Sequence, residues 1–331
     1  MNILLTGGTG YIGSHTALTL MDAGHCVVLL DNFSNSSRSV LNRLEKITGK
    51  IIPFIEADIR DTKQVVLALK EYQIESVIHF AGLKAVGESI EKPFEYFDNN
   101  IGGTISLLGA MQEASVRTLV FSSSATVYGE PQYLPINEDH PIGATNPYGR
   151  TKLHIEEMLK DMAFSNADWR ITSLRYFNPV GAHESGLIGE NPVGVPNNLM
   201  PYVAQVAAGK LECLNVYGDD YSTADGTGVR DYIHVMDLAC GHFSAINFLS
   251  QNAGYHVFNL GTGVGFSVLQ MVRAFERVVG RQIKYKIVSR RAGDVAACYA
   301  DPNKARRLLG WEPRLTLNEM CEVAWQWQLK V

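Results

Sequence analysis

The first residues of the chain restrict its fold more than any other stretch. An apolar run over residues 2–6 stops at the glycine-rich sequence GGTGYIG of residues 7–13, and residues 15–23 then show the pattern of a helix. A second apolar run, over residues 26–30, ends at Asp31. Strand, glycine turn, helix, strand and acid follow one another in the βαβ unit that binds nucleotides. The sequence therefore predicts that unit at the start of a parallel sheet.

The glycines and the acid of this unit each have a physical task. Gly7, Gly10 and Gly13 would allow a tight turn, a close approach of the backbone to a pyrophosphate, and packing of the helix on the sheet. Asp31 follows Gly13 by eighteen residues, where its carboxylate can accept hydrogen bonds from the adenosine ribose and repel a 2′-phosphate. This favours NAD over NADP as the cofactor.

Strands and helices continue to alternate after this unit. Apolar runs over residues 51–55, 76–80 and 118–121 follow helical stretches such as 62–72 and 100–114. Such alternation makes a parallel sheet that helices cover on both faces, with ligands at the carboxyl ends of the strands. The residues that we expect at or just beyond those ends are Asp58, Phe80, Ala81, Lys84 and Ser124. His79 lies inside an apolar run, and we interpret it as a packed core histidine.

The amino-acid composition and the hydrophobic pattern change near Tyr176. Gly, Pro and Asn become frequent over residues 178–198, and the apolar runs become shorter. We expect an α/β fold with two parts: a Rossmann-type, doubly wound parallel sheet over residues 1–176, and a smaller mixed α/β substrate domain over residues 177–331. Residues 231–261 again show a helix and a strand, which would return to the first sheet.

Tyr148 and Lys152 lie four residues apart, so they stand one above the other on a helix. Pro147 suits a first helical turn, which places Tyr148 near the positive end of the helix dipole. A free tyrosine has a pKa of about 10, and a base at neutral pH needs a pKa roughly 3 units lower. A neighbouring ammonium and the dipole both favour the phenolate. The pair therefore predicts a general base, preceded by the serine run of residues 122–124.

Composition and charge exclude several other classes of protein. The 331 residues are 46% hydrophobic and 19% charged, which is typical of a globular protein. The formal net charge is −5 and Lys and Arg form no dense cluster, so nucleic acid is not expected as a partner. No apolar run reaches the eighteen residues of a membrane span, and the first residues lack the basic start of a signal peptide.

The cysteines point to a reducing compartment. Five are present, without C-x-x-C pairs or regular spacing, so neither a disulfide framework nor a metal site is expected. The cytoplasm is the expected location.

Four motifs resemble the extended short-chain dehydrogenase/reductases, and among them the UDP-hexose 4-epimerases. They are the glycine stretch with Ser14 and His15, and the segments HFAGLKAVGES (79–89), FSSSATVYG (121–129) and GVRDYIHV (228–235). The resemblance covers nearly the whole chain. It implies that Tyr148 takes the proton from the sugar 4-hydroxyl while C4 passes a hydride to bound NAD, and that the hydride returns to the other face. Lys152 would hold the nicotinamide ribose, and Ser124 the reacting oxygen.

The resemblance also assigns ligand contacts by position. Besides the glycines, Tyr148 and Lys152, the NAD contacts would be Tyr11, Ile12, Asp31, Asn32, Asn35, Ser36, Asp58, Ile59, Phe80, Ala81, Lys84, Asn99 and Phe177. Besides Lys84, Ser124 and Tyr148, the UDP-sugar contacts would be Asn178, Asn198, Leu199, Asn215, Tyr217, Arg230, Tyr232, Arg291, Asp294 and Cys298. Guanidinium groups suit a diphosphate because they pair with phosphate oxygens in a bidentate way. The family also implies a homodimer, and a product used in galactose metabolism or polysaccharide biosynthesis.

Cys298 departs from part of the family. Members restricted to UDP-glucose and UDP-galactose resemble one another in carrying a tyrosine at this position. A smaller side chain leaves room for an N-acetyl group at C2, so we predict that UDP-GlcNAc and UDP-GalNAc are interconverted as well. The alternative is that another residue fills the space and Cys298 serves packing only, since apolar pockets tolerate compensating changes.

Three other functions fit parts of the sequence. One is an epimerase limited to UDP-glucose and UDP-galactose. Another is a nucleotide-sugar dehydratase or decarboxylase, but related dehydratases carry acidic residues after the catalytic Ser or Thr, and here residues 125–127 are Ala, Thr and Val. The last is a non-catalytic NAD-sensing module, which would have no use for Ser124, Tyr148 and Lys152.

Overall fold

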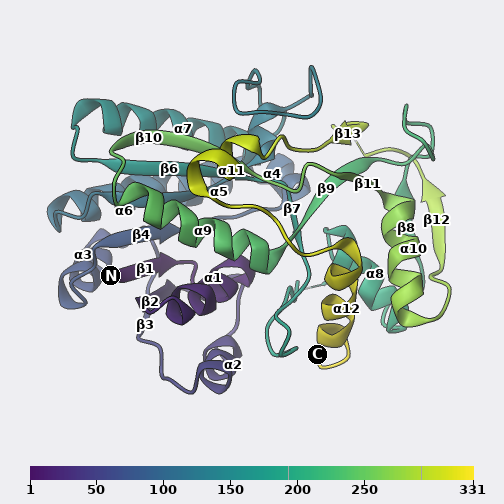
Figure 1. The fold of residues 1–331 in the computed structure, drawn as a ribbon, viewed down its shortest axis with the longest axis horizontal. Helices are drawn as coiled ribbons and strands as arrows, with labels where there is room; N and C mark the ends of the chain where they lie inside the picture. Colours follow the sequence, from purple (N-terminus) through teal and green to yellow (C-terminus); the bar gives the residue numbers. More distant parts are fainter. Residues whose placement is uncertain (193, 292) are drawn as a thin grey trace.

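The computed structural model describes residues 1–192, 194–291 and 293–331. Its centre is a parallel sheet of seven strands in the order β10-β6-β5-β4-β1-β2-β3 (Figure 1). The strands are β1 (Asn2–Thr6), β2 (Cys26–Asp31), β3 (Phe54–Glu56), β4 (Ser76–His79), β5 (Thr118–Ser124), β6 (Arg170–Tyr176) and β10 (Gly254–Leu260). The doubly wound α/β sheet expected from the alternation is confirmed.

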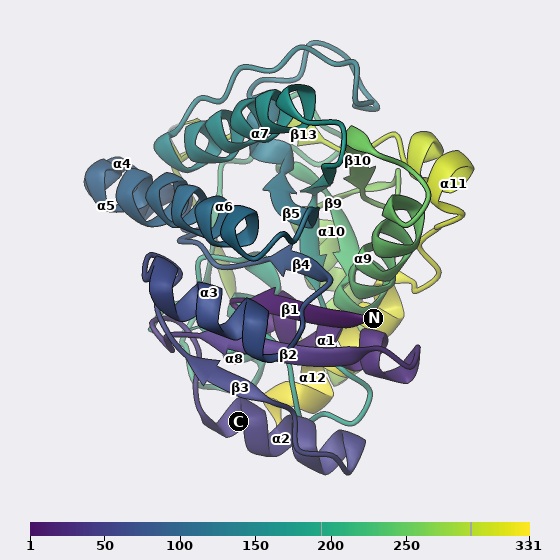
Figure 2. The ribbon, with the colours of Figure 1, turned by 90° about the vertical axis from the view of Figure 1, so that its left-hand side faces the viewer.

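Helices cover both faces of this sheet (Figure 2). One face packs against α1 (Tyr11–Asp22), α2 (Ser39–Thr48), α9 (Val235–Leu249) and α11 (Asn303–Leu309). The other packs against α3 (Thr62–Glu71), α6 (Gly103–Glu113) and α7 (Pro147–Ser165). Strands with a helix layer on each side bury both faces, which explains why they read as continuous apolar runs.

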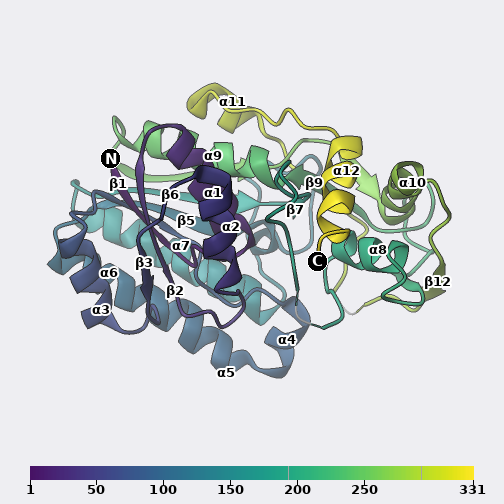
Figure 3. The same ribbon diagram turned by 90° about the horizontal axis from the view of Figure 1, so that it is seen from below.

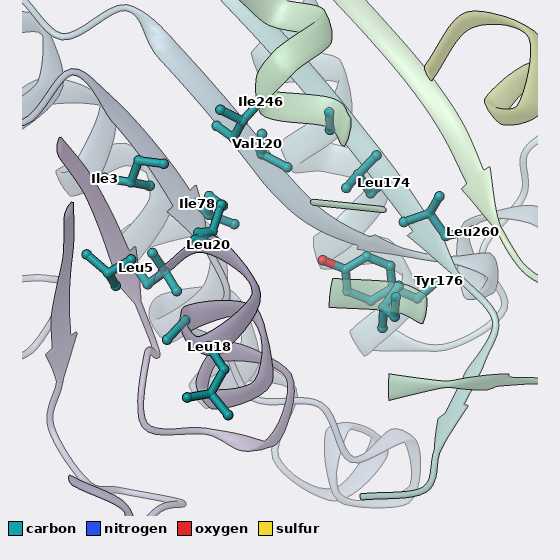
Figure 4. Close-up of a cluster of buried hydrophobic side chains, with 14 of the residues drawn as sticks. Ile3, Leu5, Leu18, Leu20, Ile78, Val120, Leu174, Tyr176, Ile246 and Leu260 are labelled. Carbon is teal, nitrogen blue, oxygen red and sulfur yellow. The ribbon is translucent and has the colours of Figure 1, made fainter. Parts of the chain in front are cut away.

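Alternate residues of each central strand enter different cores. In β1, Ile3 and Leu5 belong to one apolar cluster and Leu4 to the other. Figure 4 shows Ile3 and Leu5 of β1 in the same apolar layer as Leu18 of α1, with Ile246 of α9 farther along that layer. Each such side chain, fully removed from water, contributes about 1.5–3 kcal/mol. This burial fixes the strand register, since a slip of one residue would exchange the two faces.

Several boundaries differ from the sequence prediction. Helix α1 begins at Tyr11, inside the glycine stretch, because Gly10 has extended backbone angles and serves as its N-cap. Strand β3 contains only residues 54–56, while Ile51 is exposed. The helix predicted over residues 100–114 begins as a π-helical turn, η1 (Phe97–Gly102), and continues as α6. Single π turns are frequent at functional sites.

A second lobe lies beside the carboxyl ends of the strands of this sheet (Figure 3). It contains a small sheet in which β9 (Val229–His234) pairs with β7 (Asn178–Val180), β11 (Gly265–Ser267) and β13 (Ala297–Cys298), and a pair formed by β8 (Leu214–Tyr217) and β12 (Tyr285–Val288). Helices α8 (Leu199–Ala207), α10 (Val268–Val279) and α12 (Leu317–Gln328) share its apolar core. The remaining elements are α4 (Val86–Glu91), α5 (Pro93–Tyr96) and the 3-10 turn η2 (Ala125–Tyr128).

The chain leaves the first sheet and later returns to it. After β7 it builds much of the second lobe, and then α9 and β10 join the first sheet, where β10 pairs in parallel with β6. Within the described residues, no helix has both the length and the apolar character of a membrane span.

Candidate active site

The turn between β1 and α1 has no room for side chains at its glycines. Gly7 has a φ of +67°, and a Cβ added to it would lie 2.7 Å from the backbone N of Ala81. At Gly13 an added Cβ would lie 2.4 Å from the carbonyl oxygen of Gly7. Gly10 caps α1 without a side-chain hydrogen bond, so the first N–H groups of the helix remain open to an anion. This cradle fits a dinucleotide phosphate.

Asp31 organises the loop at the end of β2. It is buried, and it accepts hydrogen bonds from the backbone N of Thr9 (3.1 Å) and Phe33 (2.9 Å) and from the hydroxyl of Ser36 (3.1 Å). An ionised carboxylate has about four acceptor positions. One position therefore stays available on a fixed carboxylate beside the glycine turn, which suits a ribose hydroxyl.

Asp58 stands next to this loop, beyond the end of β3. It accepts a hydrogen bond of 3.1 Å from Asn32, and Arg60 contacts both of its oxygens at 2.9 Å. The hydrogen bond from Arg60 is the main reason why the pKa of Asp58 falls to about 2. The predicted contacts Asn32, Ser36 and Asp58 thus come together at one end of the sheet, as an ionised group with neighbouring polar side chains.

Asn146 starts the helix that carries Tyr148 and Lys152. Its side chain accepts a hydrogen bond of 2.8 Å from the backbone N of Gly149, and Pro147 is the first helical residue. Such caps stabilise a helix by about 1 kcal/mol. The cap fixes the first turn, and therefore the position of Tyr148, at the carboxyl end of β5.

Ser124, Tyr148 and Lys152 are brought together by β5 and α7. The Lys152 Nζ donates to the carbonyl oxygen of Ser122 at 2.6 Å, and lies 5.9 Å from the centre of the Tyr148 ring. Ser124 is the last residue of β5, and its hydroxyl lies near enough to the Tyr148 phenol to lower the pKa of that phenol. The same hydroxyl accepts hydrogen bonds from the backbone N and the hydroxyl of Thr126 at 3.2 and 3.0 Å. A substrate oxygen held by both hydroxyls would have a base and a hydrogen-bond donor within reach.

The pKa values of this pair differ from the sequence expectation. Burial raises the pKa of Tyr148 to about 12, and the hydrogen bond from Ser124 only partly opposes that rise. Burial also lowers the pKa of Lys152 to about 7, against the opposing effect of Glu156. The predicted tyrosine pKa near 7 is not reached by the protein alone. A bound cation beside Tyr148 would move it in the required direction.

Two polar residues from distant segments meet at Glu190. Its carboxylate accepts from Lys84 at 3.2 Å and from Asn198 at 2.7 Å, so a predicted NAD contact and a predicted sugar contact share one partner. Sequence reasoning did not select Glu190. Tyr11 crosses to the same region, where its hydroxyl donates to the carbonyl of Gly181 at 2.7 Å.

The remaining predicted cofactor contacts lie at or near the carboxyl ends of the strands of the first sheet. Asn99 lies on the π turn and donates to Asn100, whose side chain bridges the backbone of Leu83 and the hydroxyl of Thr151. That bridge, between the segment after β4 and helix α7, was also missed from sequence. Of the other predicted contacts, Ile59 and Phe177 are buried, Ile12, Phe80 and Ala81 are partly buried, and Asn35 is exposed.

The predicted diphosphate arginines lie in the second lobe. Arg230 of β9 donates to the carbonyls of Val229 and Val295 at 2.9 Å and lies 3.6 Å from Asp294. Arg291 stacks 3.9 Å from the ring centre of Tyr217 and lowers its pKa through a hydrogen bond. Each arginine thus contacts a predicted neighbour, Asp294 for Arg230 and Tyr217 for Arg291.

Other predicted sugar and nucleotide contacts occupy the strands of this lobe. Asn215 shares β8 with Tyr217, and among the described residues its Oδ1 is buried without a hydrogen-bond partner. Such an acceptor is costly unless something binds to it. Tyr232 is buried opposite Asn178, which is exposed, and Leu199 begins α8 after Asn198.

Cys298 lies on β13 of the second lobe. It pairs with Arg230 in the register of β13 and β9, and it packs on an apolar cluster that includes Val127 and Phe177. Ala125, which directly follows Ser124, packs on the same cluster. Burial raises the pKa of the Cys298 thiol to about 11, so the thiol is neutral where it packs on this cluster.

One cavity lies outside this site, and the described residues form no metal-binding cluster. A surface cavity of about 310 Å³ is lined by residues of α10 and β12 and the loop between them, and none of these is a predicted site residue. Within residues 1–192, 194–291 and 293–331, no group of three His, Cys, Asp or Glu side chains is arranged to hold a metal ion.

Comparisons with known proteins point to one group of enzymes. The model of the GDP-mannose 4,6 dehydratase family matches residues 4–324. The chain is 57% identical to the UDP-glucose 4-epimerase of Bacillus subtilis over 328 residues, which is 99% of this chain and 97% of the relative.

Solved structures agree with this. The UDP-glucose-4-epimerase of Stenotrophomonas maltophila, with bound NAD and formylated UDP-arabinopyranose, superimposes with a TM-score of 0.98 at 53% identity, covering 100% of this chain and 98% of that one. The UDP-Glc/GlcNAc 4-epimerase of Campylobacter jejuni gives a TM-score of 0.86 at 36% identity, with coverage of 100% and 99%.

Proposed function

The chain belongs to the UDP-glucose 4-epimerase family, and we propose on that premise that it interconverts the C4 epimers of UDP-hexoses with NAD as its cofactor. The observation that carries the proposal is the convergence of Ser124, Tyr148 and Lys152 at the carboxyl end of β5. A fold alone does not assign a reaction, whereas a positioned base with a hydrogen-bond donor does.

The cofactor would lie along the edge of the sheet that starts at the glycine turn. The N–H groups at the start of α1 would bind its pyrophosphate, and Asp31 a ribose hydroxyl. Asn32, Asp58, Lys84 and the segment from Phe80 would line the remainder. When bound, NAD supplies the transient hydride acceptor that the reaction at C4 needs.

The protein's own contribution is proton transfer at the sugar 4-hydroxyl. Tyr148 as phenolate takes the proton, and Ser124 donates a hydrogen bond to the same oxygen. Lys152, held by the Ser122 carbonyl, favours the phenolate when its amine is protonated. Inversion at C4 requires the sugar to present both faces to this site, so the opposite wall must leave it room to turn.

We further propose that the pocket accepts N-acetylated sugars, so that UDP-GlcNAc and UDP-GalNAc are interconverted as well. Two observations support this: Cys298 packs on the same apolar cluster as Ala125, which follows Ser124, and the Campylobacter jejuni relative is named for both UDP-Glc and GlcNAc. A thiol occupies far less volume than the phenol of tyrosine. The smaller side chain would leave space for a C2 acetamido group near Ser124.

One assay separates these statements. The purified protein, without added NAD, is incubated separately with UDP-glucose and UDP-GlcNAc, and the C4 epimers are resolved by chromatography. We expect turnover of both, and Cys298→Tyr should lose the activity on UDP-GlcNAc while keeping that on UDP-glucose. Turnover of UDP-glucose alone by the wild type would refute the wide pocket but retain the mechanism.

The matching family model is described as a dehydratase, which makes dehydration the second candidate reaction. Dehydration needs an acid and a base for C5 and C6, and the segment after Ser124 offers only Ala125, Thr126 and Val127. Mass spectrometry decides between the reactions, because epimerisation leaves the mass of the nucleotide sugar unchanged. A product lighter by one water would reverse our assignment.

We also propose a cytoplasmic homodimer in which residues 1–176 with the returning segment form the NAD domain and residues 177–331 the UDP-sugar domain. Large apolar side chains on α5, α6 and α7 support the dimer, since Phe94 is 80% exposed, Ile105 55% and Phe164 93%. Sedimentation of the wild type and of Phe164→Ser tests the dimer. A monomeric wild type would contradict it.

A further inference from the structure

A buried ion pair lies behind the Tyr148–Lys152 pair, and the proposed chemistry does not use it. Glu156 stands one helical turn beyond Lys152 on α7, and Arg175 comes from β6. Their side chains are 3% and 6% exposed. The Arg175 Nε and Nη2 contact the two carboxylate oxygens of Glu156 at 3.0 and 2.6 Å, which is a bidentate fork. Burying two charges is costly, so the pair requires an explanation.

Ser123 connects this pair to the catalytic strand. Its hydroxyl donates to Glu156 at 2.5 Å, and it lies beside Arg175 in the register of β5 and β6. The residues on either side of it belong to the proposed site: the Ser122 carbonyl holds Lys152, and the Ser124 hydroxyl meets Tyr148. The clamp formed by Glu156, Ser123 and Arg175 therefore fixes α7 against the one strand on which both catalytic distances depend.

The other side of Arg175 is fixed as well. Its guanidinium lies 4.8 Å from the ring centre of Tyr128, the last residue of η2. The Tyr128 hydroxyl donates to Asn259 at 2.6 Å, and Asn259 is the neighbour of Arg175 in β10. Hence the clamp also supports the turn that directly follows Ser124.

The charges in the clamp bear on the catalytic pair. Glu156 acts on buried Lys152 through the coulombic attraction that partly opposes the lowering of the lysine pKa. Arg175 brings a compensating positive charge to the same carboxylate. We propose that Glu156 and Arg175 are positioning residues, which hold α7 on the ends of β5 and β6 and balance each other's charge beside Lys152. This inference rests on the proposed function, because it concerns the base assigned there.

Other ionisable groups around the catalytic pair are neutral near pH 7. His79 of β4 has a pKa lowered to about 3 by burial, and burial raises the pKa of both Tyr96 on α5 and Tyr176 on β6. The groups that face Glu156 and Arg175 are Tyr128 and Tyr255, whose pKa values burial also raises, together with Glu138 and Glu157. A change of charge in the clamp should therefore shift the pKa values of Tyr148 and Lys152.

Single charge removals should move the catalytic pair in opposite directions. Glu156→Gln leaves the Arg175 cation unbalanced, so Tyr148 and Lys152 together lose their first proton at lower pH. Arg175→Gln leaves the carboxylate unbalanced and has the reverse effect. We expect displacements of about one pH unit for the acid limb of the kcat profile, and a near wild-type limb in the double variant Glu156→Gln/Arg175→Gln.

A spectroscopic titration gives a second readout that does not require turnover. The tyrosinate absorbance of each variant, minus that of the same variant carrying Tyr148→Phe, reports the ionisation of Tyr148. Asp161→Asn is the matched control, because it removes the same charge from an exposed position of the same helix. It should leave both readouts unchanged. If the wild type shows no epimerase activity, the proposed function fails, while the titration still decides on the clamp.

The proposed charge balance is wrong if the acid limb of the kcat profile stays in place in both single variants, or if it moves in the same direction in both. Ser123→Ala keeps the proposal testable if those variants do not fold, since it removes one hydrogen bond to Glu156 and no charge. We expect roughly tenfold lower kcat with little change in KM and an unmoved acid limb, because a small misplacement of α7 is costly. A wild-type kcat in Ser123→Ala would overturn the positioning role.

Discussion

The glycine turn and the arginine-bearing second lobe bind their proposed ligands by different physical means. At Gly7 and Gly13 the backbone itself leaves no room for a side chain, so the shape of the turn is fixed by packing. In the second lobe, Arg291 rests on Tyr217 through a long and exposed side chain. The turn is therefore fixed before any ligand binds, whereas the exposed Arg291 side chain has to be ordered on binding.

This difference implies that substitutions should have unequal effects in the two regions. A preformed site loses its function when one atom is displaced, because the closely packed neighbouring atoms cannot move to accommodate the change. A contact made by exposed, flexible side chains contributes less, since ordering them costs entropy. The catalytic residues sit on the rigid side, on β5 and α7.

Tyr148→Phe should have the largest effect on activity. The ring and its packing remain, but the group that takes the proton is lost, so kcat should fall by about 10²–10⁴-fold. Epimerisation of UDP-glucose measures the loss, and thermal unfolding serves as the control for folding. Activity at the wild-type level would show that Tyr148 is not the base.

Gly13→Ala tests the rigidity of the turn. The new Cβ would meet the Gly7 carbonyl oxygen at 2.4 Å, so the free energy of unfolding should fall by about 1–3 kcal/mol, and NAD should be lost during gel filtration. Gly109→Ala is the matched control, because an added Cβ there meets nothing within 4 Å. Equal stability of the two variants would show that the turn adapts to a side chain at Gly13 and is not rigid.

Lys152 should give the folded protein a pH dependence. The pKa of Lys152 is about 7 in the folded protein and 10.5 for a lysine in water, so between these values the unfolded chain binds the additional proton. Stability therefore rises with pH across this window, by at most about 1.4 kcal/mol per pH unit. Urea denaturation of cofactor-free wild type and Lys152→Met at pH 7, 8 and 9 measures the difference between them. Lys160→Met, at an exposed position of α7, is the control; parallel curves for wild type and Lys152→Met would contradict the burial argument.

Local signals were sufficient to predict the rigid region. The glycine spacing and the acid at Asp31 lie within one supersecondary unit, and Pro147 marks the start of α7. Interactions set by tertiary packing were not visible in the sequence. The partners Glu156 and Arg175 meet only because α7 packs on the sheet beside β6, and the pKa of Tyr148 lies above the sequence expectation because burial outweighs the helix dipole. The π turn before α6 has no sequence period of its own, so it was read as part of one helix.

Arg291→Ala should have the smallest effect, and it tests the second lobe directly. If Arg291 contacts the diphosphate, its loss should raise KM for UDP-glucose roughly tenfold, at the lower end for a charge-assisted hydrogen bond, with kcat nearly unchanged. The adjacent Arg290 offers a matched control, because it stacks on Tyr221 and pairs with Asp220 instead. Arg290→Ala should leave KM near the wild-type value. The reverse result would show that the diphosphate contact is one residue away from its expected position, which is possible only where the contact comes from side chains and not from a fixed backbone.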